Sequence, residues 1–147
     1  MSPTVWGPKV WFLLHRLSFY SDKVELVDAW KSMLLLLNNA IPCRLCRRHM
    51  RTYCLDHPLL FPRNVTGPQV REILIGWVYT FHNSVNARQK YEQFDYELLR
   101  FFYGIGSAAG AVADVGRVLK EIEDMWPPVT TKPWSTSVRH IMDIVRR

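Results

Sequence analysis

The chain has 147 residues, which is enough for one domain with its own hydrophobic core. Its content of 48% hydrophobic and 13% aromatic residues excludes a disordered or fibrous protein. The net charge of +6 is compatible with nucleic acid, an acidic protein or a phosphate-bearing cofactor, and charge does not choose among them. Three cysteines are too few for the disulfide framework of a small secreted protein, and charged residues before Leu17 interrupt any signal peptide, so we expect a cytoplasmic protein.

The first two predicted helices rest on apolar residues that recur every three or four positions. This spacing runs from Trp6 to Ser18, where Pro8 lies in the first turn and its missing N–H leaves no hydrogen bond unmade. The same spacing runs from Asp22 to Asn39 and predicts a second helix. Within this second helix we expect all of Leu34–Leu37 to be well buried.

Two more helices are predicted before the Gly/Ala-rich part of the chain. Pro42 disfavours helix at the residue before it and suits a helix start, which predicts a third helix from about Cys43 to Leu55. After a loop rich in proline and glycine, near-ideal helical spacing of apolar residues predicts a fourth helix from Val70 to Val85. Strand patterns and hairpin turns are lacking, so the sequence predicts an all-α fold, a four-helix bundle with Cys-x-x-Cys at a helix N-terminus.

The remainder of the chain is expected to be a helical C-terminal extension. We divide the sequence into a domain at residues 1–100 and an extension at 101–147 whose role the sequence does not show. The extension has a Gly/Ala-rich stretch from Gly104 to Gly116 and a predicted short helix from Ser135 to Arg146. Its uncharged run from Phe101 to Ala113 is shorter than the ~20 residues that cross a bilayer, so we expect no membrane span.

The clearest chemical motif is a pair of cysteines, Cys43 and Cys46, in the first turn of the third helix. The helix N-terminus and the neighbouring Arg44, Arg47 and Arg48 place positive charge near both thiols. Positive charge favours the thiolate, which is the form that reacts in disulfide exchange. The motif is therefore typical of a catalytic disulfide.

The residues leave an alternative open, a zinc- or nucleic-acid-binding helical module that uses Cys43, Cys46 and His49. Against zinc, Cys43 and the third cysteine, Cys54, are about 16 Å apart along one continuous helix. Cys54 is also about 12 Å from Cys46, whereas the Cα atoms of bonded cysteines lie within about 7 Å, so we expect a buried thiol that catalysis does not need. A helical interaction protein without activity is a second alternative.

A second constellation combines two predicted helices. His82, Asn86 and Lys90 are spaced by four residues, which predicts one row on the fourth helix. Trp11 and His15 form a similar pair on the first helix. Aromatic and polar side chains beside a dithiol suggest a cradle for a planar, phosphate-bearing cofactor, and a flavin fits that description best.

Three stretches carry a resemblance to one family, the Erv/ALR FAD-linked sulfhydryl oxidases, and they occur in the family's order. These are Trp6-Gly7-x-x-x-Trp11-x-x-Leu14-His15, Pro42-Cys43-x-x-Cys46-x-x-His49 and Trp77-x-x-x-Phe81-His82-Asn83-x-Val85-Asn86. The resemblance covers residues 6 to about 100. The chain looks most like the single-domain members that large DNA viruses encode.

The resemblance implies a helical bundle that binds FAD, with Cys43 and Cys46 as the catalytic pair. In the family's pattern, Cys43 forms a mixed disulfide with the substrate and Cys46 lies against the flavin. The implied cofactor contacts are Gly7, Trp11, His15, Trp77, His82, Asn83, Asn86 and Lys90. Because the family's lysine stands one position later than Lys90, the phosphate contact passes either to Lys90 or to Arg88.

The implied activity is the oxidation of dithiols to disulfides, with two electrons passed to oxygen to give hydrogen peroxide. The chain has neither the second cysteine pair nor the shuttle Cys-x-x-Cys of several cellular members. We therefore expect a thiol-containing client or a thioredoxin-like carrier as its partner. The resemblance also implies a homodimer through the first two helices and a viral disulfide pathway in the host cytoplasm or the virion. We expect no nucleic-acid partner.

Overall fold

The computed structural model describes residues 2–147, and within this range the chain forms seven α-helices, one 3₁₀ turn and no strand. The elements, in chain order, are α1 (Pro3–Ser18), α2 (Leu26–Ala40), α3 (Arg44–Asp56), α4 (Gly67–Arg88), the 3₁₀ turn η1 (Tyr96–Leu98), α5 (Leu99–Tyr103), α6 (Ala108–Met125) and α7 (Pro128–Arg146). The predicted all-α class is confirmed.

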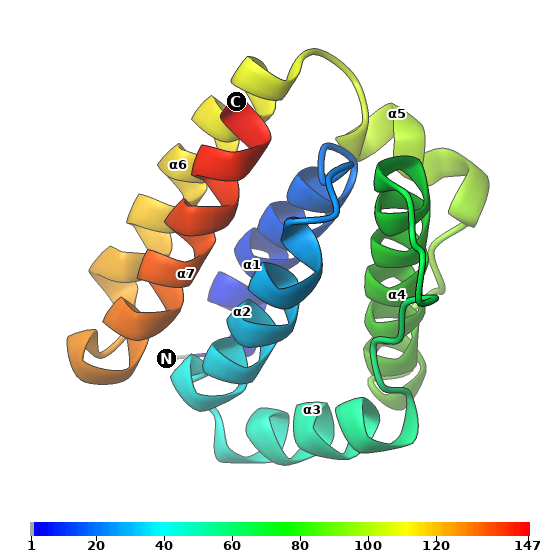
Figure 1. Ribbon diagram of the computed structural model, residues 1–147. Coiled ribbons are helices and arrows are strands. Elements are labelled where there is room, and N and C mark those ends of the chain that lie inside the picture. The colour runs from blue at the N-terminus through cyan, green and yellow to red at the C-terminus, as the bar shows by residue number, and fades with distance from the viewer. Residues whose placement is uncertain (1) are drawn as a thin grey trace.

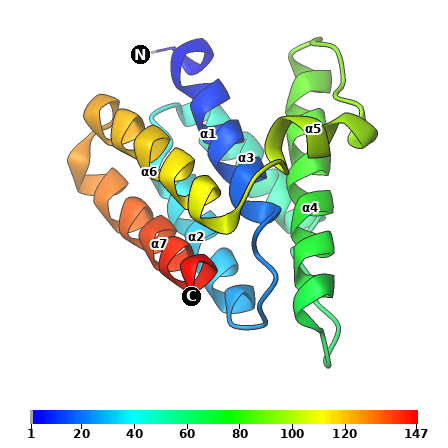
Figure 2. The ribbon, with the colours of Figure 1, turned by 90° about the horizontal axis from the view of Figure 1, so that it is seen from above.

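In the view of Figure 1, α1 and α2 occupy the middle of the molecule. The hairpin of α6 and α7 covers one side of this pair, with α6 against α1 and α7 against α2 (Figure 2). On the other side α4 packs against α1, and α3 crosses one end of the molecule from α2 towards α4. This crossing helix carries the cysteine pair.

Capping residues explain where several helices begin. The Ser2 side chain accepts a hydrogen bond from the Thr4 backbone N–H, so α1 begins three residues before the predicted start at Trp6. At α4, Thr66 and Gln69 form a reciprocal capping box, with distances of 2.9 and 3.4 Å. At α2 the helix begins at Leu26, four residues later than predicted.

The C-terminal hairpin is more regular than the sequence suggested. Most of the Gly/Ala-rich stretch belongs to α6, and α7 begins at Pro128, seven residues before the predicted Ser135. Proline is favoured in the first turn of a helix because its missing N–H has no partner there. The absent side chain of Gly116 matters for packing, since a Cβ there would lie 3.4 Å from Cε of Met142. Small residues in α6 therefore allow close contact with α7.

The hydrophobic core extends through the C-terminal hairpin. Trp30 of α2 and Trp134 of α7 are both fully buried and belong to one cluster. The core therefore continues beyond residue 100, where the part of the chain that carries the three motifs ends. The expectation that all of Leu34–Leu37 would be buried is wrong for Leu35, which is 71% exposed. Leu35 lies off the helical face that carries the buried residues of α2.

A buried arginine joins α1 to the turn before α6. Nη1 of Arg16 donates to the carbonyl oxygens of Tyr103 and Ile105, at 2.8 and 2.7 Å. Nη2 lies 3.3 Å from the carboxylate of Asp114 on α6. Gly106 has φ +104° in this turn, a backbone conformation that favours glycine. These contacts fix α5 and the start of α6 against α1.

No single helix in the described range is both long and apolar enough to cross a membrane. The segments Tyr96–Tyr103 and Ala108–Met125 reach that composition only when they are taken together, and they are bent by 88°.

Candidate redox and cofactor site

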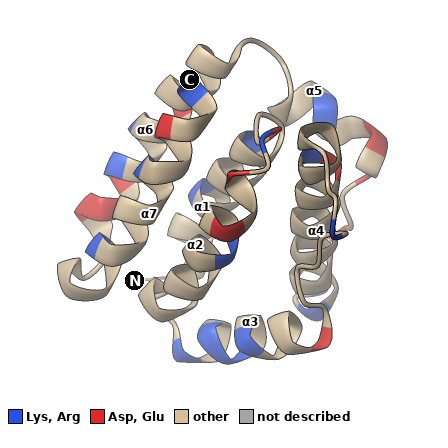
Figure 3. Ribbon diagram, in the orientation of Figure 1, with Lys and Arg blue, Asp and Glu red and all other residues tan. Residues whose placement is uncertain are grey.

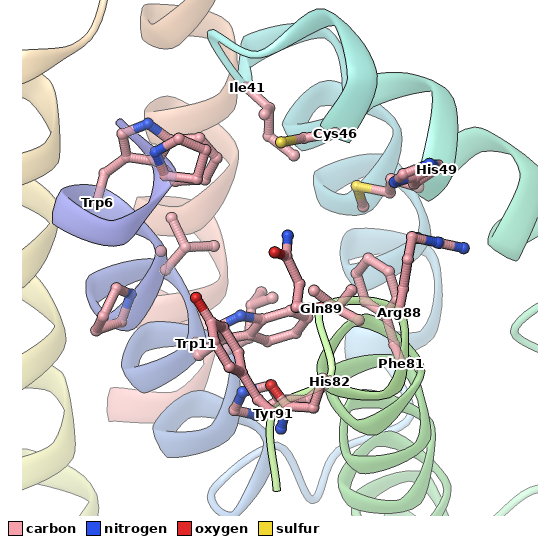
Figure 4. Close-up of a pocket in the computed structure, with 18 of the residues that line it drawn as sticks. Trp6, Trp11, Ile41, Cys46, His49, Phe81, His82, Arg88, Gln89 and Tyr91 are labelled. Atoms are coloured by element: carbon pink, nitrogen blue, oxygen red, sulfur yellow. The ribbon is translucent and has the colours of Figure 1, made fainter. Parts of the chain in front are cut away.

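A cavity of about 600 Å³ opens between α1, the end of α2, α3 and the C-terminal half of α4. This volume falls in the range of about 300–1,000 Å³ that is usual for ligand and cofactor sites. Aromatic side chains form much of the wall, and basic and amide side chains approach it from α3, α4 and the following loop (Figure 4). The labelled residues of the wall include Trp6, Trp11, Cys46, His49, Phe81, His82 and Arg88.

The two cysteines of the motif are joined as a disulfide at the start of α3. Their Cα atoms lie 5.2 Å apart. Cys43 is the N-cap of α3, and its sulfur accepts a hydrogen bond of 3.2 Å from the Cys46 backbone N–H. Cys46 lies in the cavity wall, whereas Cys43 is outside it. Only one residue of the disulfide, Cys46, therefore lies in the cavity wall.

The zinc alternative receives no support from the geometry. Both Cys43 and Cys46 are used in the disulfide, and residues 2–147 contain no group of three His, Cys, Asp or Glu side chains placed to hold a metal ion. Helix α3 is continuous from Arg44 to Asp56, so the long separation of Cys46 and Cys54 along the helix is confirmed. Cys54 is free and half-buried, and burial raises the pKa of its thiol.

Two histidines and two aromatic residues form a stack beside the cavity. The rings of Trp11 and His82 are parallel within 10° at a centroid separation of 4.1 Å. Nδ1 of His82 lies 2.9 Å from Nε2 of His15, so one of these nitrogens donates a hydrogen bond to the other. On its far side, His15 stacks on Tyr103 at 4.6 Å. The cluster joins α1, α4 and α5.

Burial holds both imidazoles in the neutral form. Loss of solvent lowers the pKa of His15 from 6.5 to about 3, and electrostatic repulsion by His82 makes a smaller contribution. Loss of solvent also lowers the pKa of His82 to about 4. Nδ1 of His15 is buried without a hydrogen-bond partner among the described residues. At neutral pH the histidine pair is therefore uncharged, and it keeps one buried polar atom without a hydrogen-bond partner.

Four of the expected cofactor contacts lie in the cavity wall, namely Gly7, Trp11, His82 and Asn86. His15 lies directly behind His82 and does not reach the wall.

Three other expected contacts lie outside the wall. Trp77 donates from Nε1 to the His57 carbonyl oxygen at 2.8 Å and so ties the end of α3 to α4. Asn83 exchanges two hydrogen bonds with the Phe94 backbone, at 2.8 and 3.1 Å. Lys90 does not continue the predicted row of His82 and Asn86, because α4 ends at Arg88 and Lys90 has φ +62°. Of the two candidates for a phosphate contact, Arg88 is the one in the wall.

Sequence reasoning missed Tyr91 and Tyr103, which both line the cavity. They follow α4 in a loop and a short helix, where no helical spacing marks a residue as inward-facing. Their aromatic character was a signal, but only the fold of residues 89–103 brings them back against α1.

Basic groups gather at one edge of the cavity. Burial lowers the pKa of His49, and the nearby charges of Arg88 and Arg48 lower it further. Within the described residues, neither Arg88 nor Arg48 has a carboxylate within 4 Å. Arg88, a cation in the cavity wall without a carboxylate partner, suits a ligand with a flat ring and an anionic part.

Comparison with known proteins gives consistent matches. FAD-linked sulfhydryl oxidases of a Kenyan, a Malawian and a Namibian isolate of African swine fever virus are each 33% identical to the chain over 86 residues. The match spans 56% of this chain and 66% of each relative's length. No solved structure matches the chain significantly. The sequence model of the Erv1/Alr family matches residues 8–103, which is more than half of the chain, and the chain therefore belongs to the Erv1/Alr family.

Proposed function

We propose that this protein is an FAD-dependent thiol oxidase. It oxidises two thiols of a client to a disulfide, and the two electrons and two protons reduce molecular oxygen to hydrogen peroxide. One observation carries the proposal: a disulfide at a helix N-terminus has one sulfur, that of Cys46, in the wall of an aromatic cavity of about 600 Å³. The viral relatives are named FAD-linked sulfhydryl oxidases, which supports the same activity.

The residues around the cavity fit FAD. Trp11, His82 and Phe81 offer flat surfaces for ring stacking, and Asn86 offers an amide for hydrogen bonding. Arg88 lies at the edge of the cavity where a diphosphate would meet positive charge, and the neutral imidazole of His49 offers a hydrogen bond beside it. FAD bound here would accept two electrons from the reduced cysteine pair and pass them to oxygen.

His15, Trp77 and Asn83 are proposed to act on the site indirectly. His15 holds His82 through their hydrogen bond. Trp77 and Asn83 fix the end of α3 and the loop after α4 through their bonds to His57 and Phe94. Lys90 is proposed only as a distant charge, since Arg88 takes the position nearer to the cavity.

The chemistry at the cysteines follows from their positions. A client thiolate attacks Sγ of Cys43, which lies outside the cavity wall, and a mixed disulfide forms as the Cys43–Cys46 bond breaks. Cys46 leaves as a thiolate close to the backbone N–H groups of the first turn of α3, where negative charge is stabilised. The second client thiol then attacks the mixed disulfide, which releases the oxidised client and leaves Cys43 reduced.

The setting is proposed to be a viral disulfide pathway in the host cytoplasm or the virion, with a thiol-containing client or a thioredoxin-like carrier as electron donor. The homodimer implied by the family resemblance remains a proposal. Helices α1 and α2 already pack against α6 and α7. A second copy would have to use the faces that the hairpin leaves open, where Val5 and Leu35 are exposed. Sedimentation of the purified chain tests this.

The central experiment combines a visible absorbance spectrum with oxygen consumption in the presence of dithiothreitol. We expect bound flavin in the purified protein, and we expect Cys43→Ser and Cys46→Ser each to abolish turnover while flavin stays bound. Cys54→Ser is the matched control and should retain turnover. A colourless protein that binds zinc through the same cysteines would refute the proposal, and so would turnover in both single variants.

A further inference from the structure

The outer face of α3 carries a row of arginines that leads away from the cysteine pair. Arg44, Arg48 and Arg51 are spaced by four and three residues, so they share one face of the helix, and all three are exposed. The sequence holds no Asp or Glu between Asp28 and Asp56. Figure 3 shows the result: α3 is marked by basic residues until its last turn. We call these three residues the arginine row.

The arginine row is not neutralised by the protein itself. Six arginines elsewhere lie within 4.0 Å of a carboxylate, namely Arg16, Arg71, Arg117, Arg139, Arg146 and Arg147. In the described residues no such pair involves the arginine row. Like charges one turn apart destabilise a helix slightly, so the row does not stabilise α3 by itself.

The neighbouring arginine has a different role. Nη1 of Arg47 donates to the Ile41 carbonyl oxygen at 2.6 Å and holds the turn between α2 and α3. Within the described residues, the guanidinium groups of the arginine row donate no hydrogen bond to a backbone carbonyl or to another side chain. Its charge is therefore free to act on a molecule that approaches Cys43, and Arg44 lies in the first turn, at the positive end of the α3 dipole.

We propose that the arginine row is the docking surface for clients that carry acidic residues close to the cysteine to be oxidised. This inference rests on the proposed thiol oxidase function and assigns its substrate class. The row runs about 10 Å along α3, which matches about three residues of an extended peptide. Acidic side chains within three or four positions of the client cysteine would therefore reach the row while the client thiolate meets Cys43. Leu45, which is 56% exposed between the two cysteines, adds an apolar contact.

An acidic peptide fits this surface better than a nucleic acid does. Single-stranded nucleic acids bind through exposed aromatic rings between basic residues, and the one aromatic residue of α3 except histidine, Tyr53, is buried. The row also begins beside the redox-active sulfur, where a protein thiol must approach. Charge complementarity therefore selects an acidic protein segment.

The test uses the flavin-loaded full chain and three synthetic peptides, each with two cysteines flanked by Asp, Ser or Lys residues. We expect kcat/KM from oxygen consumption to be about tenfold higher for the Asp peptide than for the Lys peptide at low ionic strength. High salt should reduce this ratio towards one, because it screens exposed charges.

The variant Arg44→Glu/Arg51→Glu should reverse the preference. Arg146→Glu/Arg147→Glu makes the same change in net charge at the opposite end of the molecule from α3, and it should retain the preference for the Asp peptide (Figure 1). Turnover of dithiothreitol, an uncharged dithiol, is measured for every variant and serves as the reference for each ratio.

Equal kcat/KM for the three peptides would overturn the docking proposal, as would loss of the preference in the control variant alone. Competition by duplex DNA in the absence of a peptide preference would overturn it in favour of a nucleic-acid surface. Failure to oxidise dithiothreitol at all would instead refute the proposed function, so the two failures are distinguishable.

Discussion

Acidification from pH 7 to pH 5 should destabilise this protein through its buried histidine pair. His15 and His82 have folded-state pKa values of about 3 and about 4, below the 6.5 of an unfolded histidine. The unfolded chain therefore binds two protons in this pH range that the folded chain does not bind. Stability rises with pH wherever the unfolded state binds more protons. On acidification, stability is therefore lost from near pH 6.5 down to the folded pKa values.

The size of the effect follows from linkage. A histidine that titrates at 6.5 when unfolded and stays neutral when folded loses about 2 kcal/mol of stabilisation between pH 7 and pH 5. Two such residues give about 4 kcal/mol, which is a large part of the 5–15 kcal/mol typical of a domain. Glu123, whose pKa is lowered by Arg139, loses its stabilisation mainly below pH 5, outside this window.

Urea unfolding followed by tryptophan fluorescence measures this difference at the two pH values. His15→Gln should remove about half of the pH dependence, whatever it does to stability at pH 7, and His82→Gln should act in the same direction. His140→Gln, at an exposed site on α7, is the matched control and should leave the pH dependence as it is. A wild-type change below about 1 kcal/mol, or an unchanged pH dependence in His15→Gln, would refute the burial argument.

Three further predictions concern separate parts of the molecule. His82→Ala should lower flavin content and melting temperature together, as measured by absorbance and thermal unfolding, because a bound ligand stabilises the fold by mass action; unchanged flavin content would show a purely structural role. Cys54→Ser should retain oxygen consumption, and Cys54 should react slowly with alkylating reagents, because burial raises its thiol pKa. Trp134→Ala should lower the unfolding free energy by about 3–5 kcal/mol in urea titrations, since the ring is fully buried in the core shared with α2; a loss below about 1 kcal/mol would show that the hairpin is not part of the cooperative unit.

The sequence by itself determined the helices and the chemistry of the redox pair. Helical spacing and the proline at position 42 are local signals, so they placed the start of α3 within a residue and with it the disulfide at a helix N-terminus. The ordered motifs on α1, α3 and α4 then indicated the Erv/ALR family, which the comparisons show. The isolation of Cys54 from the cysteine pair followed from helical rise along a helix predicted to be continuous, and α3 is continuous.

Tertiary structure decided which faces of these helices are buried. Leu34 shares one helical face with the buried Trp30 and Leu37, and Leu35 lies off that face. The width of the buried face depends on the elements that pack against α2, among them α7. The C-terminal hairpin likewise became part of the core because the apolar faces of α1 and α2 lie against it. Such contacts join residues about a hundred positions apart, which local periodicity does not reveal.

The end of α4 shows the same limit inside the site. Spacing by four put Lys90 in one row with His82 and Asn86, but that row exists only while the helix continues. The helix ends at Arg88, and the backbone turns at Lys90 with φ +62°, so that Arg88 and the following loop close the cavity. The residue types of the site were therefore set by the sequence, and their positions in the cavity wall were set by where one helix stops and by the return of residues 91–103 to α1.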